Sequence, residues 1–258
     1  MSDSPLAKQR AVLGLPDNVR ACLFDLDGVL TKTAALHAAA WKQMFDAYLA
    51  ERGKRAGEQF TPFDPVADYD DYVDGKPRYE GVQSFLAARG IDLPRGDPSD
   101  PSDAETVDGL GNRKNAIVLQ LIRERGVERY EGSVRFVRAA RDAGLRRAVV
   151  SSSTNCREVL EAAGIADLFE VRIDGVLAER NHLRGKPAPD TFLAAASAFA
   201  LEPAQAAVFE DSLAGVAAGR AGGFGFVVGV DRTGQREALH DHGADVVVAD
   251  LADMLDER

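Results

Sequence analysis

The sequence has few cysteines and no excess of basic residues, and each shortage excludes a class of protein. Two unclustered cysteines, Cys22 and Cys156, provide neither a disulfide framework nor a structural zinc site, and they suit a reducing cytosol. Acidic residues outnumber basic ones by 41 to 31, and the resulting net charge of −10 argues against binding to a nucleic-acid backbone. We therefore expect no nucleic-acid partner.

Long apolar runs are also missing. The first ten residues, MSDSPLAKQR, lack the apolar core of a signal peptide, and no run is long enough to span a bilayer. Since 45% of the 258 residues are nevertheless hydrophobic, the chain can bury a sizeable core as one large domain or two smaller ones. These features predict a cytoplasmic protein without a membrane partner, and we expect a monomer.

Short apolar runs alternate with helix-like segments along much of the chain. Five runs are almost continuously hydrophobic, as parallel strands covered on both faces are: 21–25, 147–151, 206–210, 224–230 and 244–250. Helical patterns lie between or beside them at 133–144, 155–165, 189–201 and 212–223. This order predicts an α/β fold with a doubly wound, Rossmann-like parallel sheet.

One long stretch breaks that rhythm. Helical patterns cover 35–53 and 112–126, and a Pro/Asp/Ser-rich segment at 93–109 between them is typical of an exposed loop. We find no convincing buried strand there, so we expect a helical domain inserted after the first strand. The predicted domains are a discontinuous α/β catalytic core, residues 1–33 and 130–258, and a helical cap, residues 34–129.

Polar residues collect where the predicted strands end, and the carboxyl ends of parallel strands share one edge of a sheet. They are Asp25 and Asp27 after the first run, Ser151 after the second, Glu210 and Asp211 after the third, and Lys186 before a helix. Crowded carboxylates need a counter-charge, and a hard divalent cation with oxygen ligands, Mg²⁺, supplies it. Beside such a cation and a lysine, a carboxylate stays ionised and can attack phosphorus.

Four short motifs resemble, in order and spacing, the signature of the haloacid dehalogenase superfamily in its phosphotransferase branch. They are DLDGVLT (25–31), SSS (151–153), KPAPD (186–190) and EDS (210–212). Three further stretches resemble the β-phosphoglucomutase group of that superfamily: KTAALHAAAW (32–41), VDGKPRY (73–79) and RKN (113–115). The resemblance covers the chain from residue 19 to about residue 230.

The resemblance implies a role for each matched residue. Asp25 would be the nucleophile that becomes an aspartyl-phosphate, and Asp27 the general acid/base with its backbone carbonyl on the metal. The Mg²⁺ ligands would be Asp25, Asp27, Glu210 and Asp211. Ser151 and Lys186 would bind the transferring phosphate. The implied substrate-binding residues are His37, Trp41, Gly75, Lys76, Arg78, Lys114, Ser152, Ser153 and Asn155.

Several of these residues have a structural alternative. Ser151 could cap the helix that follows it, and an isolated Lys186 would be read as a solvated surface lysine. The alternatives within the predicted cap are packing roles for His37 and Trp41, solvated loop charges for Lys76 and Arg78, and a surface charge for Lys114.

The implied activity is that of an isomerase of carbohydrate metabolism. A Mg²⁺-dependent phosphomutase would interconvert β-D-glucose 1-phosphate and glucose 6-phosphate through the 1,6-bisphosphate, with a small hexose phosphate or bisphosphate as its partner. A sugar-phosphate phosphatase, a hydrolase of the same superfamily, is the first alternative, because both reactions use Asp25 and Asp27. A non-catalytic sugar-phosphate sensor is the second, although such a protein has no need of a nucleophile.

Overall fold

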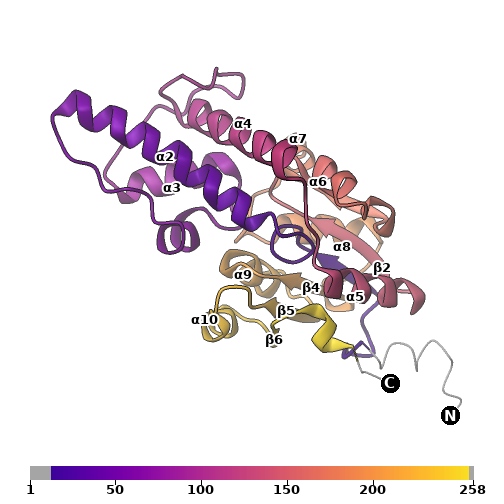
Figure 1. Cartoon of the computed structure of the whole chain (residues 1–258). Helices are drawn as coiled ribbons and strands as arrows, with labels where there is room; N and C mark the ends of the chain where they lie inside the picture. The colour runs from indigo at the N-terminus through magenta and orange to yellow at the C-terminus, as the bar shows by residue number, and fades with distance from the viewer. Residues whose placement is uncertain (1–12, 256–258) are drawn as a thin grey trace, which may run out of the picture. The chain divides into compact units, whose positions relative to one another are not determined.

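The computed structural model describes residues 13–255 of the chain (Figure 1). The chain divides into two compact units, one formed by Met1–Lys32 with Val127–Arg258 and the other by Thr33–Gly126. The first unit is α/β and the second is helical. Residues 1–12 and 256–258 of the predicted core, and with them the MSDSPLAKQR segment, lie outside the described residues.

A six-stranded parallel sheet forms the centre of the α/β unit, in the order β3-β2-β1-β4-β5-β6. The strands are β1 (Ala21–Phe24), β2 (Arg146–Val150), β3 (Val171–Ile173), β4 (Ala206–Glu210), β5 (Phe226–Val230) and β6 (Val246–Val248). The chain runs outward from β1 to β3 and then returns to β4 on the other side of β1, which is a doubly wound order. The predicted fold class is confirmed.

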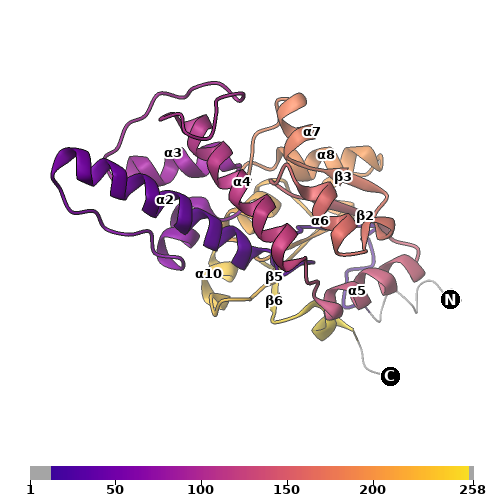
Figure 2. The same cartoon turned by 45° about the horizontal axis from the view of Figure 1, so that its top comes forward.

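Helices cover both faces of this sheet (Figure 2). They are α5 (Glu131–Asp142), α6 (Cys156–Ala162), α7 (Gly175–Arg180), α8 (Asp190–Ala198), α9 (Leu213–Ala221) and α10 (Arg236–Asp241). Successive strand residues point to opposite faces. Leu23 packs in one cluster with Phe192 of α8, whereas Phe24 stacks on Phe209 and meets Phe136 of α5 edge-on. The central strands are therefore apolar on both sides.

Strand β3 and helices α7 and α10 were not predicted from the sequence. The strand has three residues, and its middle residue, Arg172, is exposed at the edge of the sheet. The two helices have six residues each. Elements this short show no hydrophobic period, because fewer than two helical turns or two strand repeats are present.

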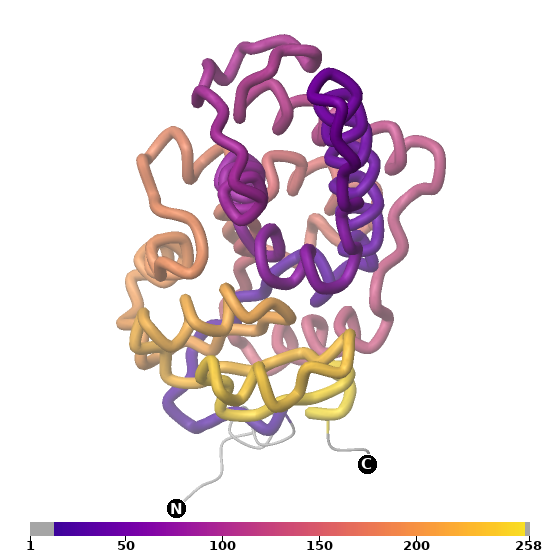
Figure 3. Tube along the Cα trace, turned by 90° about the vertical axis from the view of Figure 1, so that its left-hand side faces the viewer, coloured from indigo at the N-terminus to yellow at the C-terminus, as the bar shows by residue number. Residues whose placement is uncertain are grey.

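The helical unit contains α2 (Ala34–Ala56), the π-helical turn η1 (Tyr69–Val73), α3 (Arg78–Ala88) and α4 (Val107–Arg125). Figure 3 follows their trace from the indigo of α2 to the magenta of α4. An aromatic core holds them: Phe45 of α2 stacks on Trp41 at 5.3 Å and lies 4.1 Å from the ring centroid of Phe85 in α3. Helix α4 begins five residues before the predicted start because the Thr106 hydroxyl accepts a hydrogen bond from Gly109 N and caps it.

Within residues 13–255, none of the helices combines the length and the apolar character that crossing a membrane requires.

Candidate active site

The strand register brings three chain segments to one edge of the sheet. Phe24 of β1 is aligned with Val149 of β2 on one side and with Phe209 of β4 on the other. The next residue, Asp25, donates its backbone N–H to the Phe209 carbonyl at 2.9 Å. Asp25 therefore leaves β1 beside Glu210, the last residue of β4.

Lys186 lies between these two carboxylates. Its Nζ is 2.5 Å from Oδ1 of Asp25 and also donates to Oε1 of Glu210, and its third neighbour is the Val150 carbonyl at 3.5 Å. The Lys186 side chain is 1% exposed. Lys186 is therefore a buried ion-pair partner and not a solvated surface lysine.

Burial and charge oppose each other at this ion pair. Burial raises the pKa of the Asp25 carboxyl well above its ordinary value; Lys186 opposes that shift, while Glu210 and Asp27 add to it. Burial alone would lower the pKa of Lys186, but the two carboxylates outweigh it and the pKa is raised. Lys186 therefore stays protonated, and its charge partly offsets the rise in the pKa of Asp25 that burial causes.

A third carboxylate, Asp211, joins the cluster. Oxygen atoms of Asp25, Glu210 and Asp211 all lie within 4.8 Å of one another. The turn after β1 approaches Asp211 closely: Gly28 has φ +85°, and a Cβ built there would lie 1.6 Å from Asp211 Oδ2. Asp27 lies in the same turn and is half-buried. The three oxygen ligands suit a hard divalent cation.

Ser212 holds the Glu210 carboxylate, and it was not among the site residues predicted from the sequence. Its N–H and hydroxyl both donate to Glu210 Oε2, at 3.2 Å and 2.9 Å. The same hydroxyl accepts from Gly215 N at 3.0 Å and caps α9. A serine immediately before a helical pattern is a capping signal, so this residue could have been found from the sequence.

The segment after β5 contacts both acidic turns and was also missed. Arg232 Nε donates to the Gly28 carbonyl at 2.8 Å, and Gln235 Nε2 donates to the Asp211 carbonyl at 3.3 Å. The guanidinium carbon of Arg232 lies 3.6 Å from the centroid of the Tyr130 ring, and its Nη1 donates to the Ala249 carbonyl at 2.7 Å. The position of this segment beyond the carboxyl end of a parallel strand is the signal that could have drawn attention to it.

The predicted phosphate-binding turn follows β2. Ser151 is 1% exposed, and its hydroxyl accepts from Ser153 N at 3.1 Å. The Ser153 hydroxyl in turn accepts from Asn155 N at 3.1 Å. Ser152, which lies between Ser151 and Ser153, is half-buried. Since α6 begins at Cys156 with Asn155 as its N-cap residue, Ser151 does not cap that helix.

In the helical unit the structure brings three of the predicted substrate-binding residues together. Lys114 Nζ is 2.8 Å from His37 Nδ1 and 4.6 Å from the centroid of the Trp41 ring. Lys114 is 5% exposed, so the expectation of a surface charge was wrong. An ammonium can be buried here because the aromatic face and the imidazole nitrogen both attract it. Trp41 belongs to the aromatic core as well.

The remaining predicted residues of this unit lie around the start of α3. Gly75 and Lys76 connect η1 to α3, and Lys76 Nζ donates to Ser84 Oγ at 3.1 Å. Burial lowers the pKa of Lys76. Arg78 is not a loop residue: it is the first residue of α3, with Pro77 before it. Its Nη2 donates to Tyr79 OH at 2.7 Å and to Asn112 Oδ1 at 3.2 Å.

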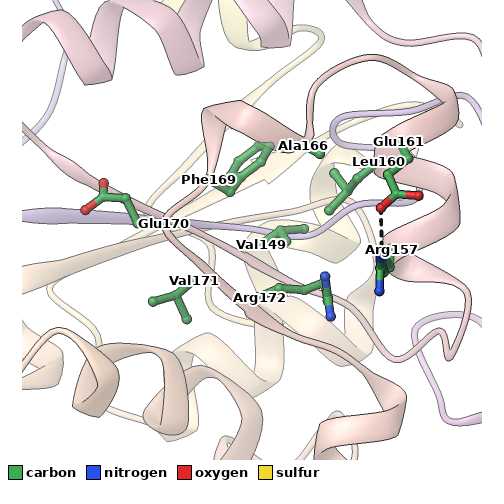
Figure 4. Close-up of a pocket in the computed structure, with 9 residues that line it drawn as sticks. All are labelled: Val149, Arg157, Leu160, Glu161, Ala166, Phe169, Glu170, Val171 and Arg172. Carbon is green, nitrogen blue, oxygen red and sulfur yellow. Dashed lines mark hydrogen bonds and ion pairs between the residues drawn. The ribbon is translucent and has the colours of Figure 1, made fainter.

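A separate hollow of about 330 Å³ lies between α6 and the edge strand β3 (Figure 4). Its charged lining consists of two arginines and two glutamates, and Arg157 is paired with Glu161 at 2.8 Å. None of the nine residues that line it is among the predicted site residues. The acidic cluster is therefore the stronger candidate for chemistry.

Comparison with known proteins agrees with this geometry. The sequence model of the haloacid dehalogenase-like hydrolase family matches residues 19–223. The chain is 59% identical over 247 residues to a β-phosphoglucomutase of Mycobacterium bovis, covering 95% of this chain and 94% of that protein. It is 32% identical over 237 residues to a β-phosphoglucomutase of Bacillus subtilis, covering 92% of each. The crystal structure of a β-phosphoglucomutase from Clostridium difficile matches 91% of this chain and 92% of that one, with a TM-score of 0.69 and 25% identity.

Proposed function

Because the chain belongs to the haloacid dehalogenase-like hydrolase family, we propose that it is a β-phosphoglucomutase. It would interconvert β-D-glucose 1-phosphate and glucose 6-phosphate through β-glucose 1,6-bisphosphate. The observation that carries this proposal is the 59% identity to a mycobacterial β-phosphoglucomutase over 95% of the chain. The buried arrangement of Asp25, Lys186 and Glu210 supports it, because phosphate transfer through a carboxylate needs a nucleophilic carboxylate that is held in place, and Lys186 holds Asp25.

Asp25 is the proposed nucleophile. Its carboxylate oxygen forms a bond to phosphorus while the bond from phosphorus to the sugar oxygen breaks, and the product is an aspartyl-phosphate. Asp27, two residues on, gives a proton to the departing sugar oxygen and removes one from the sugar hydroxyl that later attacks. Lys186 holds Asp25 in place at 2.5 Å, which reduces the freedom that the nucleophile must lose on reaction.

We propose that Asp25, Glu210 and Asp211, with the backbone carbonyl of Asp27, hold a Mg²⁺ ion. The donor set fits, because three carboxylates gather within 4.8 Å and hard oxygen ligands are those that Mg²⁺ prefers. The ion would neutralise charge on the phosphoryl oxygens. Ser151 and Lys186 would bind the same phosphate from the other segments of the sheet edge.

The helical unit is proposed as the substrate-binding cap. His37, Trp41, Gly75, Lys76 and Lys114 would bind the sugar, and the proposed role of Arg78 is to bind the phosphate that does not react. Ser152, Ser153 and Asn155, in the turn after β2, would assist. The guanidinium of Arg78 suits phosphate binding, since its planar fork of N–H donors matches phosphate oxygens.

Product analysis separates the mutase from its alternatives. Incubation with β-D-glucose 1-phosphate, Mg²⁺ and a trace of the 1,6-bisphosphate should yield glucose 6-phosphate. Release of inorganic phosphate alone would contradict the mutase and favour a phosphatase. A non-catalytic sensor would give neither product, and it would also fail to bind beryllofluoride in the presence of Mg²⁺. The Asp25→Asn variant is the control for background hydrolysis.

A further inference from the structure

The acidic loop, defined here as residues 93–106, is held in one conformation by its own side chains. Asp97 Oδ1 accepts from Ser99 N and from Ser99 Oγ, at 2.9 Å and 2.6 Å. Asp100 Oδ2 accepts from Thr106 Oγ1 at 2.6 Å, and Thr106 caps α4. The loop is thus ordered and is fastened to the first turn of α4.

Asn112 of α4 connects this loop to Arg78. On one side, its Nδ2 donates to the carbonyls of Pro98 and Asp100 at 3.0 Å and 2.9 Å. On the other side, its Oδ1 accepts from Arg78 Nη2 at 3.2 Å and from Tyr79 OH at 3.1 Å. The amide of Asn112 therefore bonds the loop through its nitrogen and Arg78 through its oxygen. Rotation of this amide would break the hydrogen bonds on both sides.

Tyr79 completes the arrangement. Its hydroxyl accepts from Arg78 Nη2 at 2.7 Å, and the Arg78 guanidinium carbon lies 4.6 Å from the centroid of its ring. Arg95 of the acidic loop lies 5.1 Å from the same ring centroid and is paired with Asp108, which is fully buried, at 2.9 Å. The loop therefore reaches Arg78 by two routes, through Asn112 and through the Tyr79 ring.

From these contacts we infer that the acidic loop is a positioning element for Arg78 and acts through Asn112. A long arginine side chain loses conformational entropy when it binds a ligand, and fixing it beforehand lowers that cost. The inference rests on the proposed role of Arg78 in binding the non-reacting phosphate. Asn112 and Tyr79 are positioning residues for it.

Steady-state kinetics of the full chain test the inference. Asn112→Ala should raise the KM for β-glucose 1,6-bisphosphate about 10-fold, with a smaller change in kcat, because hydrogen bonds to a charged group are lost. Tyr79→Phe keeps the ring and should give a smaller rise. In an Arg78→Ala background, Asn112→Ala should add nothing, because the group that it positions is already gone.

The matched control is Arg113→Ala. Arg113 is the next residue of α4, and its Nε also holds the loop, by donating to the Ser102 carbonyl at 2.6 Å. Because Asn112 keeps its bonds to the loop and to Arg78 in this variant, the KM should rise clearly less than in Asn112→Ala, and thermal melting checks that all variants are folded. Equal losses in Arg113→Ala and Asn112→Ala, or additive losses in the Arg78→Ala background, would overturn the role of Asn112.

Failure of the proposed role of Arg78 would give a different pattern of KM values from failure of the inference about the acidic loop. If Arg78→Ala itself leaves the KM for the bisphosphate unchanged, then Arg78 does not bind the phosphate and the premise is wrong. If Arg78→Ala raises that KM while Asn112→Ala does not, the premise stands and the inference about the acidic loop is overturned.

Discussion

Lys186 and Asp25 form a buried ion pair in which Nζ lies 2.5 Å from Oδ1, although they are 161 positions apart in the chain. The same ammonium also bonds Glu210. Because one cation serves two carboxylates, the local charge remains negative, and a third carboxylate, Asp211, adds to the excess. The site is therefore suited to a divalent cation, and its stability should depend on pH, on the metal and on each member of the cluster.

Lys186→Met should destabilise the protein, and more strongly at pH 8 than at pH 5. Without the ammonium, nothing opposes the burial and like charges that raise the pKa of Asp25. A carboxyl with a raised folded-state pKa binds more protons in the folded than in the unfolded protein, so stability falls as pH rises toward that pKa. We expect a loss on the order of 3 kcal/mol at pH 8, measured by urea unfolding.

The control for Lys186→Met is Arg184→Ala. Arg184 is exposed and lies two residues before Lys186 in the sequence, and it forms an ion pair with Asp190. It should change stability little at either pH, since exposed ion pairs are screened by solvent. A loss in Lys186→Met that does not vary with pH would contradict the coupling to Asp25.

Asp25→Asn should abolish phosphate transfer while leaving the fold intact. The amide is nearly the same size as the carboxylate but is not a nucleophile, so turnover should fall at least about 10³-fold. The measurement is incorporation of phosphate from the bisphosphate into the protein, followed by mass spectrometry. Phosphate incorporation at the wild-type level would remove Asp25 from the mechanism.

Mg²⁺ should stabilise the protein by binding to the three carboxylates. At 100 times its dissociation constant, a ligand that binds only the folded state adds about 2.7 kcal/mol, so the melting temperature should rise with added Mg²⁺ and fall with a chelator. Asp211→Asn removes one ligand and should shrink this shift. If wild type and variant respond equally, Asp211 is not part of the metal site.

Gly28→Ala should weaken Mg²⁺ binding as well as stability. A methyl group there would lie 1.6 Å from Asp211 Oδ2, so the Asp211 carboxylate would have to leave its position or the turn would have to move. Gly234→Ala is a matched control, because Gly234 has the same φ of +85° and a Cβ there would meet nothing within 4 Å. The control should lose about 1–2 kcal/mol from backbone strain alone. Equal Mg²⁺ affinities in the two variants, measured by titration calorimetry, would contradict the close approach.

Arg232→Lys should lower Mg²⁺ affinity several-fold, because lysine keeps the charge but cannot bond Gly28 and Ala249 with separate nitrogens. Arg236→Lys is the control: Arg236 donates to the Val247 carbonyl in the same C-terminal region. Titration calorimetry without substrate measures the metal affinity directly. A wild-type affinity in Arg232→Lys would show that its bond to Gly28 is dispensable.

The fold class could be predicted because its evidence is local. Strands β1 and β4 are short apolar runs whose residues are buried on both faces of the sheet, as Leu23 and Phe24 are in β1. Such runs can be seen in the sequence itself. The three-residue edge strand β3 could not be predicted, because its short, partly exposed sequence carries no period. The motifs around Asp25 and Asp211 were recognisable for a similar reason, since their residue types and order are written in the chain.

By itself, the sequence determined the parallel sheet, the acidic character of its carboxyl edge and the resemblance to a phosphate-transferring family. Only the tertiary structure decided that Lys186 and Lys114 are buried, that Arg232 supports the turn at Gly28, and that Asn112 joins the acidic loop to Arg78. The physical reason is distance along the chain. Periodicity and capping act between close neighbours, whereas these contacts join residues 12 to 204 positions apart. The burial of a charged side chain likewise depends on which distant segments cover it.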